Sequence, residues 1–182
     1  MPLGGPRVAV VGTRRPSSAG LGAARLIAGR LAERGAIIVS GLARGIDTAA
    51  HRAAIERGGR TIAVLGTPLD GFYPPENRDL QLEIMREHLA VSQFPLGHVT
   101  RPRDFLARDR TIALIADAVV IVEAGPAGGT AFTGRAALRL GRPLWIWRDV
   151  FNDPALTWPW EMVGRGARRL DEDSVDSIIK IK

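Results

Sequence analysis

The stretch Arg7-Val8-Ala9-Val10-Val11-Gly12 is a short apolar run, rich in β-branched residues, that ends in glycine. A strand buried on both faces of a parallel sheet has this unbroken pattern, because neither of its faces meets water. Residues 20–34 then repeat apolar side chains at helical spacing and are followed by Gly35, which is typical of a helix C-cap. The start of the chain therefore predicts a strand followed by a helix.

This strand-then-helix unit recurs along the chain. Further apolar strands are predicted at residues 36–40, 61–65, 89–94, 118–122 and 144–147. Helices are predicted from a cap at Asp47 or Thr48 to Glu56, from a cap at Asn77 through Met85, over residues 105–115, and over residues 130–140. Such alternation predicts an α/β, Rossmann-like fold with a mainly parallel sheet flanked by helices on both faces.

No repeat, low-complexity tract or linker interrupts the pattern, so we expect residues 1–182 to form a single Rossmann-like domain. Residues 7–147 carry the clear pattern, and residues 148–182 are expected to complete the sheet edge.

The composition excludes several classes of protein. Of 182 residues, 46% are hydrophobic and 24% are charged, as in a globular domain. No apolar run is long enough to span a membrane and the first residues do not resemble a signal peptide, so a cytoplasmic protein without a membrane partner is expected. The chain has no cysteine and three scattered histidines, which argues against a metal site and redox chemistry.

The positive charge is concentrated in the first third of the chain. Residues 1–60 carry ten arginines against three acids, whereas residues 61–147 are balanced. The planar guanidinium group suits bidentate contact with phosphate, so an anionic partner is expected. A GC-rich genome would also favour arginine over lysine without any functional demand, and this alternative stays open.

Four glycine-rich loops follow the predicted strands, where ligands of open α/β sheets bind. They comprise residues 12–15, 40–47, 66–68 and 125–130. In the second loop, Gly41 and Gly45 permit positive φ angles, so the N–H groups of this loop could form a nest for an anion. Ser40 offers a hydroxyl group to a phosphate, and Arg44 offers a guanidinium group. The alternative is that these glycines only make tight turns.

Named cofactor and catalytic motifs are absent. Gly20-Leu21-Gly22 lies inside a predicted helix and does not match the dinucleotide fingerprint, and no P-loop occurs. His51 is on an alanine-rich helix, where a packing or surface role is more common than a catalytic one. We therefore expect no cofactor, and no residue stands out as catalytic.

Three segments together resemble the DprA/Smf family of DNA-processing proteins: Ser40-Gly41-Leu42-Ala43-Arg44-Gly45-Ile46-Asp47, Gly58-Gly59-Arg60-Thr61-Ile62-Ala63-Val64-Leu65-Gly66, and Tyr73-Pro74-Pro75-Glu76-Asn77. The order and spacing extend through Phe94-Pro95-Leu96-Gly97 and Arg108-Asp109-Arg110. The resemblance covers residues 7–147 and implies the Rossmann domain of that family alone.

This resemblance implies a protein that binds single-stranded DNA without strong sequence preference, protects incoming strands and assists loading of a RecA-type recombinase, without substrate turnover. It also implies a homodimer. The DNA or phosphate site is expected at Arg14, Ser40, Gly41, Arg44, Gly45, Arg108, Arg110, Gly128, Gly129 and Thr130. Phe72, Tyr73, Phe94 and Phe105 are candidate base-stacking residues, although a core or loop-anchoring role is the more common one for such rings.

Two departures from the family pattern keep an alternative open. Asp109 stands where the family has asparagine between two arginines, and a carboxylate there could quench a phosphate site. Gly128-Gly129-Thr130 also differs from the family loop, and it is closer to the loop of nucleotide-handling Rossmann proteins, although the glutamate of nucleoside-monophosphate N-glycosidases is missing. The alternative is therefore a nucleotide-binding or N-glycosidase-like protein. A scaffold that contacts partners through Trp158-Pro159-Trp160 is a further possibility.

Overall fold

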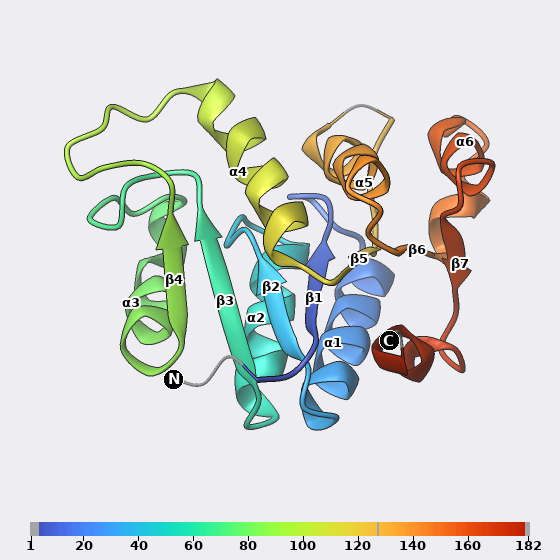
Figure 1. Ribbon diagram of the computed structural model, residues 1–182, viewed down its shortest axis with the longest axis horizontal. Coiled ribbons are helices and arrows are strands. Elements are labelled where there is room, and N and C mark those ends of the chain that lie inside the picture. Colours follow the sequence, from blue (N-terminus) through green and yellow to red (C-terminus); the bar gives the residue numbers. More distant parts are fainter. Residues whose placement is uncertain (1–3, 127, 181–182) are drawn as a thin grey trace.

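A computed structural model describes residues 4–126 and 128–180 (Figure 1). One seven-stranded sheet has the order β4-β3-β2-β1-β5-β6-β7. Every neighbouring pair of strands is parallel. The strands are β1 (Arg7–Val11), β2 (Ile37–Ser40), β3 (Arg60–Leu65), β4 (Leu89–Ser92), β5 (Ala118–Ile121), β6 (Leu144–Trp147) and β7 (Arg168–Leu170). The predicted Rossmann-like parallel sheet is therefore confirmed.

The helices cover both faces of this sheet (Figure 1). From β1 the chain adds β2, β3 and β4 towards one edge of the sheet. It then crosses back to β5 beside β1 and adds β6 and β7 towards the other edge. Because each crossover is right-handed, the helices that lead towards the two edges lie on opposite faces. One group contains α1 (Ser18–Glu33), α2 (Ile46–Glu56) and α3 (Arg78–Glu87). The other contains α4 (Pro102–Ile115) and α5 (Gly129–Arg139).

The C-terminal part adds short elements beside the last strands. These are η2 (Arg148–Asn152), α6 (Trp158–Val163) and η3 (Val175–Lys180), while η1 (Pro75–Asn77) precedes α3. The turn η3 packs against α1. Among the helices that the structure describes, none has the length and apolarity needed to cross a bilayer.

The core consists of the central strands and the inner faces of the helices. Val8 to Val11 and the whole of β5 are buried. Alanines such as Ala28 and Ala50 are fully buried on α1 and α2, which pack against each other, because small side chains let two helices approach closely. This rigid layer fixes the positions of the loops at the carboxyl ends of the strands.

Two of the differences from the predicted element boundaries have clear local reasons. The strand β4 ends at Ser92, not Phe94, because Ser92 Oγ accepts a hydrogen bond of 3.0 Å from the Phe94 N–H and turns the chain. The helix α2 begins at Ile46, with Gly45 as its N-cap, so the prediction that Asp47 or Thr48 caps this helix was wrong. Asp47 lies in the first turn and serves the preceding loop instead.

Candidate nucleic-acid interface

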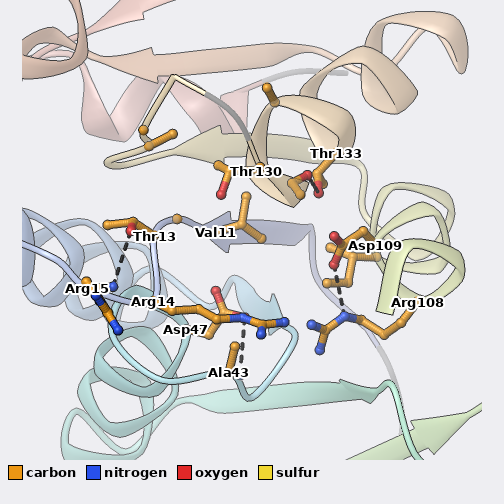
Figure 2. A pocket seen from close by; sticks show the side chains of 17 residues that line it. Val11, Thr13, Arg14, Arg15, Ala43, Asp47, Arg108, Asp109, Thr130 and Thr133 are labelled. Atoms are coloured by element: carbon orange, nitrogen blue, oxygen red, sulfur yellow. Dashed lines mark hydrogen bonds and ion pairs between the residues drawn. The ribbon is translucent and has the colours of Figure 1, made fainter. Parts of the chain in front are cut away.

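The loops of interest meet where the strand order reverses, between β1 and β5. There the chain leaves β1 towards β2 and leaves β5 towards β6, so the loops after these strands diverge and leave a hollow at the carboxyl edge. We call this hollow the switch-point cavity. It encloses about 400 Å³, and Arg14, Asp47, Arg108, Asp109 and Thr130 contribute to its wall (Figure 2).

A second hollow lies beside the first. We call it the aromatic groove; it encloses about 200 Å³ and is lined by Arg14, Arg15, Gly41, Ala43, Arg44, Tyr73, Pro74, Phe105 and Arg108. Arg14, Arg15, Ala43 and Arg108 line both hollows. The two hollows therefore share a basic wall.

The loop from residue 41 to residue 45 is held firmly in place. Leu42 has a positive φ of 57°, a rare conformation for a residue with a side chain, and it is fully buried as an anchor beneath the loop. The Leu42 carbonyl accepts a hydrogen bond of 2.9 Å from Asn77 Nδ2. Gly45 has a φ of 78°, so the predicted positive φ occurs at Gly45 but not at Gly41.

Asp47 fills the concave side of this loop. Its Oδ2 accepts a hydrogen bond of 3.1 Å from the N–H group of Gly41. It also accepts one of 3.3 Å from the N–H group of Ala43 (Figure 2). The predicted nest of N–H groups therefore holds the protein's own carboxylate in this structure. Burial raises the pKa of Asp47 to about 6, against the opposing charge of Arg108.

Arg108 is a buried arginine that ties α4 to two strand ends. It is 4% exposed, and it donates to the carbonyl oxygens of Gly41 and Val64. Its Nε donates to Asp109 Oδ1 at 2.9 Å. Gly41 has no room for a side chain, because a Cβ there would collide with the Arg108 guanidinium. Arg108 is therefore a positive charge fixed in the shared wall.

Asp109 lies against the start of α5. Its Oδ2 is 2.5 Å from the position that a Cβ of Gly129 would take, so the carboxylate occupies the space beside the first turn of this helix. A helix N-terminus attracts anions, and here an internal anion is already near it. Burial raises the pKa of Asp109, while the Arg108 charge opposes the rise.

Tyr73 and Phe105 give the groove its aromatic character. Their ring centroids are 5.1 Å apart, and the Arg14 guanidinium lies 5.4 Å from the Phe105 centroid. Phe105 packs on Gly66, where a Cβ would meet the ring, whereas Tyr73 is 49% exposed. One ring is thus anchored and the other faces solvent.

The residue pattern and the geometry agree with what is found in known proteins. Residues 2–181 match the family described as DNA recombination-mediator protein A. The chain belongs to this family. Protein Smf of Synechocystis sp. is 44% identical over 82% of the chain and 36% of its own length, and DNA processing protein DprA of Streptococcus pneumoniae is 44% identical over 82% of the chain and 50% of its own length. The chain thus matches a third to a half of these relatives.

Solved structures of recombination-mediator relatives superpose closely on the chain. DNA processing protein A from Streptococcus pneumoniae, 36% identical, gives a TM-score of 0.89 over 99% of this chain and 64% of that one. DNA processing protein A from Helicobacter pylori, described for its single-stranded DNA binding mode, is 28% identical with a TM-score of 0.85 over 96% of this chain and 80% of that one. A molybdenum cofactor carrier protein from Chlamydomonas reinhardtii, 21% identical with a TM-score of 0.66, shares the fold.

In this member of the recombination-mediator family, most of the predicted site residues come together. Arg14, Gly41, Arg44 and Arg108 line the aromatic groove, and Gly128, Gly129 and Thr130 line the switch-point cavity. Gly45 lines a third hollow beside Arg44, between α1 and α2. Ala127, in the loop before α5, lies outside the described residues, as do residues 1–3 and 181–182 of the predicted domain.

Two predicted site residues lie elsewhere. Ser40 is fully buried and its Oγ donates to the Val10 carbonyl at 2.7 Å, so its hydroxyl does not face either hollow. Arg110 is exposed on α4, but it lines neither hollow, because residues two apart on a helix point in nearly opposite directions.

The other aromatic candidates also point away from the groove. Phe72 lies under the Arg78 guanidinium at 4.9 Å, and Phe94 stacks on His98 with centroids 4.8 Å apart. Trp145 and Trp147 are buried in β6.

Sequence reasoning flagged Asp109 beside its arginines but missed Glu76, an exposed acid that pairs with Arg44. Glu76 belongs to the motif of residues 73–77, and this motif bonds to the loop that carries Arg44, so the motif was a weak signal for the pair. Arg15 belongs to the predicted loop 12–15 but was not among the predicted site residues, and it lines both hollows.

His51 takes no part in the site. It is fully buried, and its Nδ1 is 2.6 Å from Thr61 Oγ1, whose proton is donated to the Ile38 carbonyl, so Nδ1 carries the hydrogen. Burial lowers the pKa of His51 to about 3 and keeps the ring neutral. Within residues 4–126 and 128–180, no group of three or more His, Asp or Glu side chains is placed to hold a metal ion.

Proposed function

We propose that this chain binds single-stranded DNA in the aromatic groove. The carrying observation is the half-exposed ring of Tyr73 beside the anchored ring of Phe105, with the guanidinium groups of Arg14 and Arg15, which have no ion pair in the part of the chain that the structure describes, around them. Arg44 lines the same groove and pairs there with Glu76 at the exposed rim. A base stacks on an aromatic face whatever its identity, and arginines bind the phosphates on either side of it. Such a groove holds a single strand without reading its sequence.

The relatives support this proposal. DNA processing protein A from Helicobacter pylori is described for its binding of single-stranded DNA, and its fold superposes on almost the whole chain. By extension, we propose that this chain protects incoming strands and assists a RecA-type recombinase to load on them. It would act as a homodimer in the cytoplasm and would not turn over its ligand.

The nucleotide-handling alternative has less support from the geometry. A nucleoside monophosphate would place its phosphate at the N-terminus of α5, near Gly129 and Thr130. Asp109 already lies there, and Asp47 lines the same cavity. Two buried carboxylates repel a phosphate dianion unless they are protonated or move aside.

A competition titration separates the two readings. Fluorescently labelled single-stranded DNA is titrated with the protein at low salt, and unlabelled mononucleotides are then added as competitors. We expect binding that mononucleotides displace poorly and that weakens steeply with salt, because phosphate contacts release counterions. Displacement by a mononucleotide at the concentration of DNA, or release of free base from AMP, would instead establish the nucleotide reading.

Arg14→Ala supplies the matching test within the chain. We expect the affinity to fall by a similar factor on every oligonucleotide sequence, with the salt slope reduced by about 0.7 for one lost phosphate contact. Arg139→Ala, an exposed arginine at the far end of α5, is the control and should not change the affinity. An Arg14 variant that binds DNA as tightly as the natural chain would remove the groove from the proposal.

The proposed partners need separate measurements. Light scattering of the purified chain should give twice the mass of one chain, and a monomer at high concentration would refute the homodimer.

Recombinase filament formation on strands coated with single-strand-binding protein should accelerate when the chain is added. No acceleration would leave strand binding without the proposed loading role.

A further inference from the structure

A third hollow extends from the rim down the outside of the sheet, between α1 and α2. We call it the helix groove; it encloses about 500 Å³. Arg14 and Arg44 line its upper end and also line the aromatic groove, so the two hollows are continuous at these side chains. Arg25 of α1 and Arg52 of α2 line it further down. With a rise of 1.5 Å per residue, these two arginines are about 10 Å from the start of their helices.

The arginines of these two helices fall into two groups. Towards the lower end, Arg30 and Arg34 pair with Asp176 at 3.0 and 2.6 Å, and Arg57 pairs with Glu33. In contrast, Arg25 and Arg52 are exposed, and neither has an ion pair or hydrogen bond to any residue that the structure describes. The molecule thus neutralises the lower arginines and leaves the pair in the helix groove uncompensated.

The walls of the helix groove suit a sugar-phosphate backbone better than bases. Between the arginines the lining consists of small or aliphatic residues such as Leu21, Gly45 and Ala49, and no aromatic side chain lines this hollow among the described residues. Phosphates bind arginines without any requirement for stacking. Two acids also line this hollow: Glu76, which pairs with Arg44 at the rim, and Glu56, one helical turn beyond Arg52, whose charge would repel a phosphate.

We infer that the helix groove is a second, extended part of the DNA site, which takes the phosphates of a strand as it leaves the aromatic groove. This inference rests on the proposed function, and it adds a path and a length. The strand passes Arg14 and Arg44 at the rim, runs between α1 and α2 past Arg25 and Arg52, and leaves the protein before Glu56. Strands too short to reach Arg25 and Arg52 use the aromatic groove alone.

The test compares strand lengths in one double variant. Fluorescence anisotropy is measured with oligothymidylates of about 5 and about 15 nucleotides, which bracket a short and an extended site. The natural chain is compared with Arg25→Ala/Arg52→Ala. We expect the variant to bind the long strand about threefold to tenfold more weakly, with the salt slope lowered by about 0.7 for each lost phosphate contact. The affinity for the short strand should stay unchanged.

The control is Arg34→Ala/Arg57→Ala. It removes the same charge from the same two helices but acts on arginines that are already paired with Asp176 and Glu33. We expect it to bind both strands as the natural chain does. All four side chains are exposed, so both variants should fold, and thermal unfolding followed by circular dichroism verifies this.

Three outcomes would overturn the inference. The Arg25/Arg52 variant binds the long strand as tightly as the natural chain, or it loses affinity for both strands equally, or the control variant loses as much affinity for the long strand. The last two results would mean that net charge alone acts. A natural chain that binds neither strand at low salt would instead refute the proposed function itself, and the extended path with it.

Discussion

The switch-point cavity and the aromatic groove share one wall and differ in what faces it. Arg14, Arg15, Ala43 and Arg108 belong to both. On the cavity side, Asp47 and Asp109 lie opposite these arginines, whereas on the groove side Tyr73 and Phe105 do. Arg108 is therefore neutralised by Asp109, whereas the guanidinium groups of Arg14 and Arg15 have no ion pair among the described residues and are available to a ligand.

The difference shows how a Rossmann-like rim can favour a polymer over a mononucleotide. A carboxylate beside the N-terminus of α5 competes with a phosphate for the helix dipole, while the exposed ring of Tyr73 lies between arginines that can bind the phosphates on either side of a stacked base, and only a polymer has both. The comparison depends on Arg108 and the two acids remaining fixed and on Tyr73 remaining exposed. Four variants test these conditions, in order of decreasing effect.

Arg108→Met tests whether the buried contacts of Arg108 in the shared wall stabilise the fold. The variant leaves Asp109 and two buried carbonyl oxygens without their donor, and removing one member of a buried ion pair costs about 3 kcal/mol of the free energy of unfolding. Urea denaturation measures this. Arg108→Met/Asp109→Asn should recover part of the loss, because no unpaired charge remains. Equal stability of the two variants would show that Asp109 does not depend on Arg108.

Asp47→Asn tests, through the pH dependence of stability, whether the Asp47 carboxylate is buried in the wall of the cavity. The pKa of Asp47 is about 6 in the folded chain and lies near 3.8 in the unfolded chain, so the unfolded chain releases this proton first as pH rises. The natural chain therefore loses stability between pH 3.8 and 6, by about 1.4 kcal/mol for each unit of pKa difference. The variant lacks this loss, so its stability relative to the natural chain should rise over that window. A difference independent of pH would contradict the burial of a charge at Asp47.

Tyr73→Ala tests the stacking side of the comparison. We expect single-stranded DNA to bind about tenfold more weakly, since one stacked base contributes about 1 to 3 kcal/mol. Tyr73→Phe keeps the ring and should bind normally. Phe72→Ala removes a neighbouring ring that does not line the groove and should leave the affinity unchanged. Equal losses in Tyr73→Ala and Phe72→Ala would show that the loop, not the exposed ring, matters.

Asp109→Asn sharpens the comparison with the smallest change. It restores the residue expected from the family pattern and removes the charge that engages Arg108 Nε. The Arg108 charge should then act more strongly on a strand in the groove and raise the affinity by about twofold to threefold, a small effect because solvent and salt screen charges at the rim. Anisotropy titration measures the change. An affinity equal to or below that of the natural chain would show that the charge of Asp109 is not felt in the groove.

Much of the architecture follows from short-range patterns. The apolar runs that became β1, β2, β3, β5 and β6 were located to within a residue or so, because a strand buried on both faces leaves no polar position in the sequence. The inclusion of Gly20 and Gly22 in α1 also followed from helical spacing. The rim loops could be named in advance, since parallel strands bring all their carboxyl ends to one edge.

The roles of individual polar side chains did not follow from those patterns. Asp47 was expected to cap α2, yet it binds the loop before the helix, and Ser40 was expected at a phosphate but bonds to Val10. The partner of each side chain is the donor or acceptor that lies within about 3 Å of it in space. For Ser40 this partner is 30 residues away in the sequence, and for Asp47 it is six residues away, so no local pattern predicts it.

The layers, the parallel sheet and the edge at which a ligand would bind follow from the order of residues along the chain, because buried strands show as unbroken apolar runs and helices as apolar spacings of three to four residues. Which arginines remain available depends on how the elements pack together. Arg44 meets Glu76, Arg108 meets Asp109, and Arg25 and Arg52 converge from two helices, because ion pairing depends on distances between elements that no local pattern encodes.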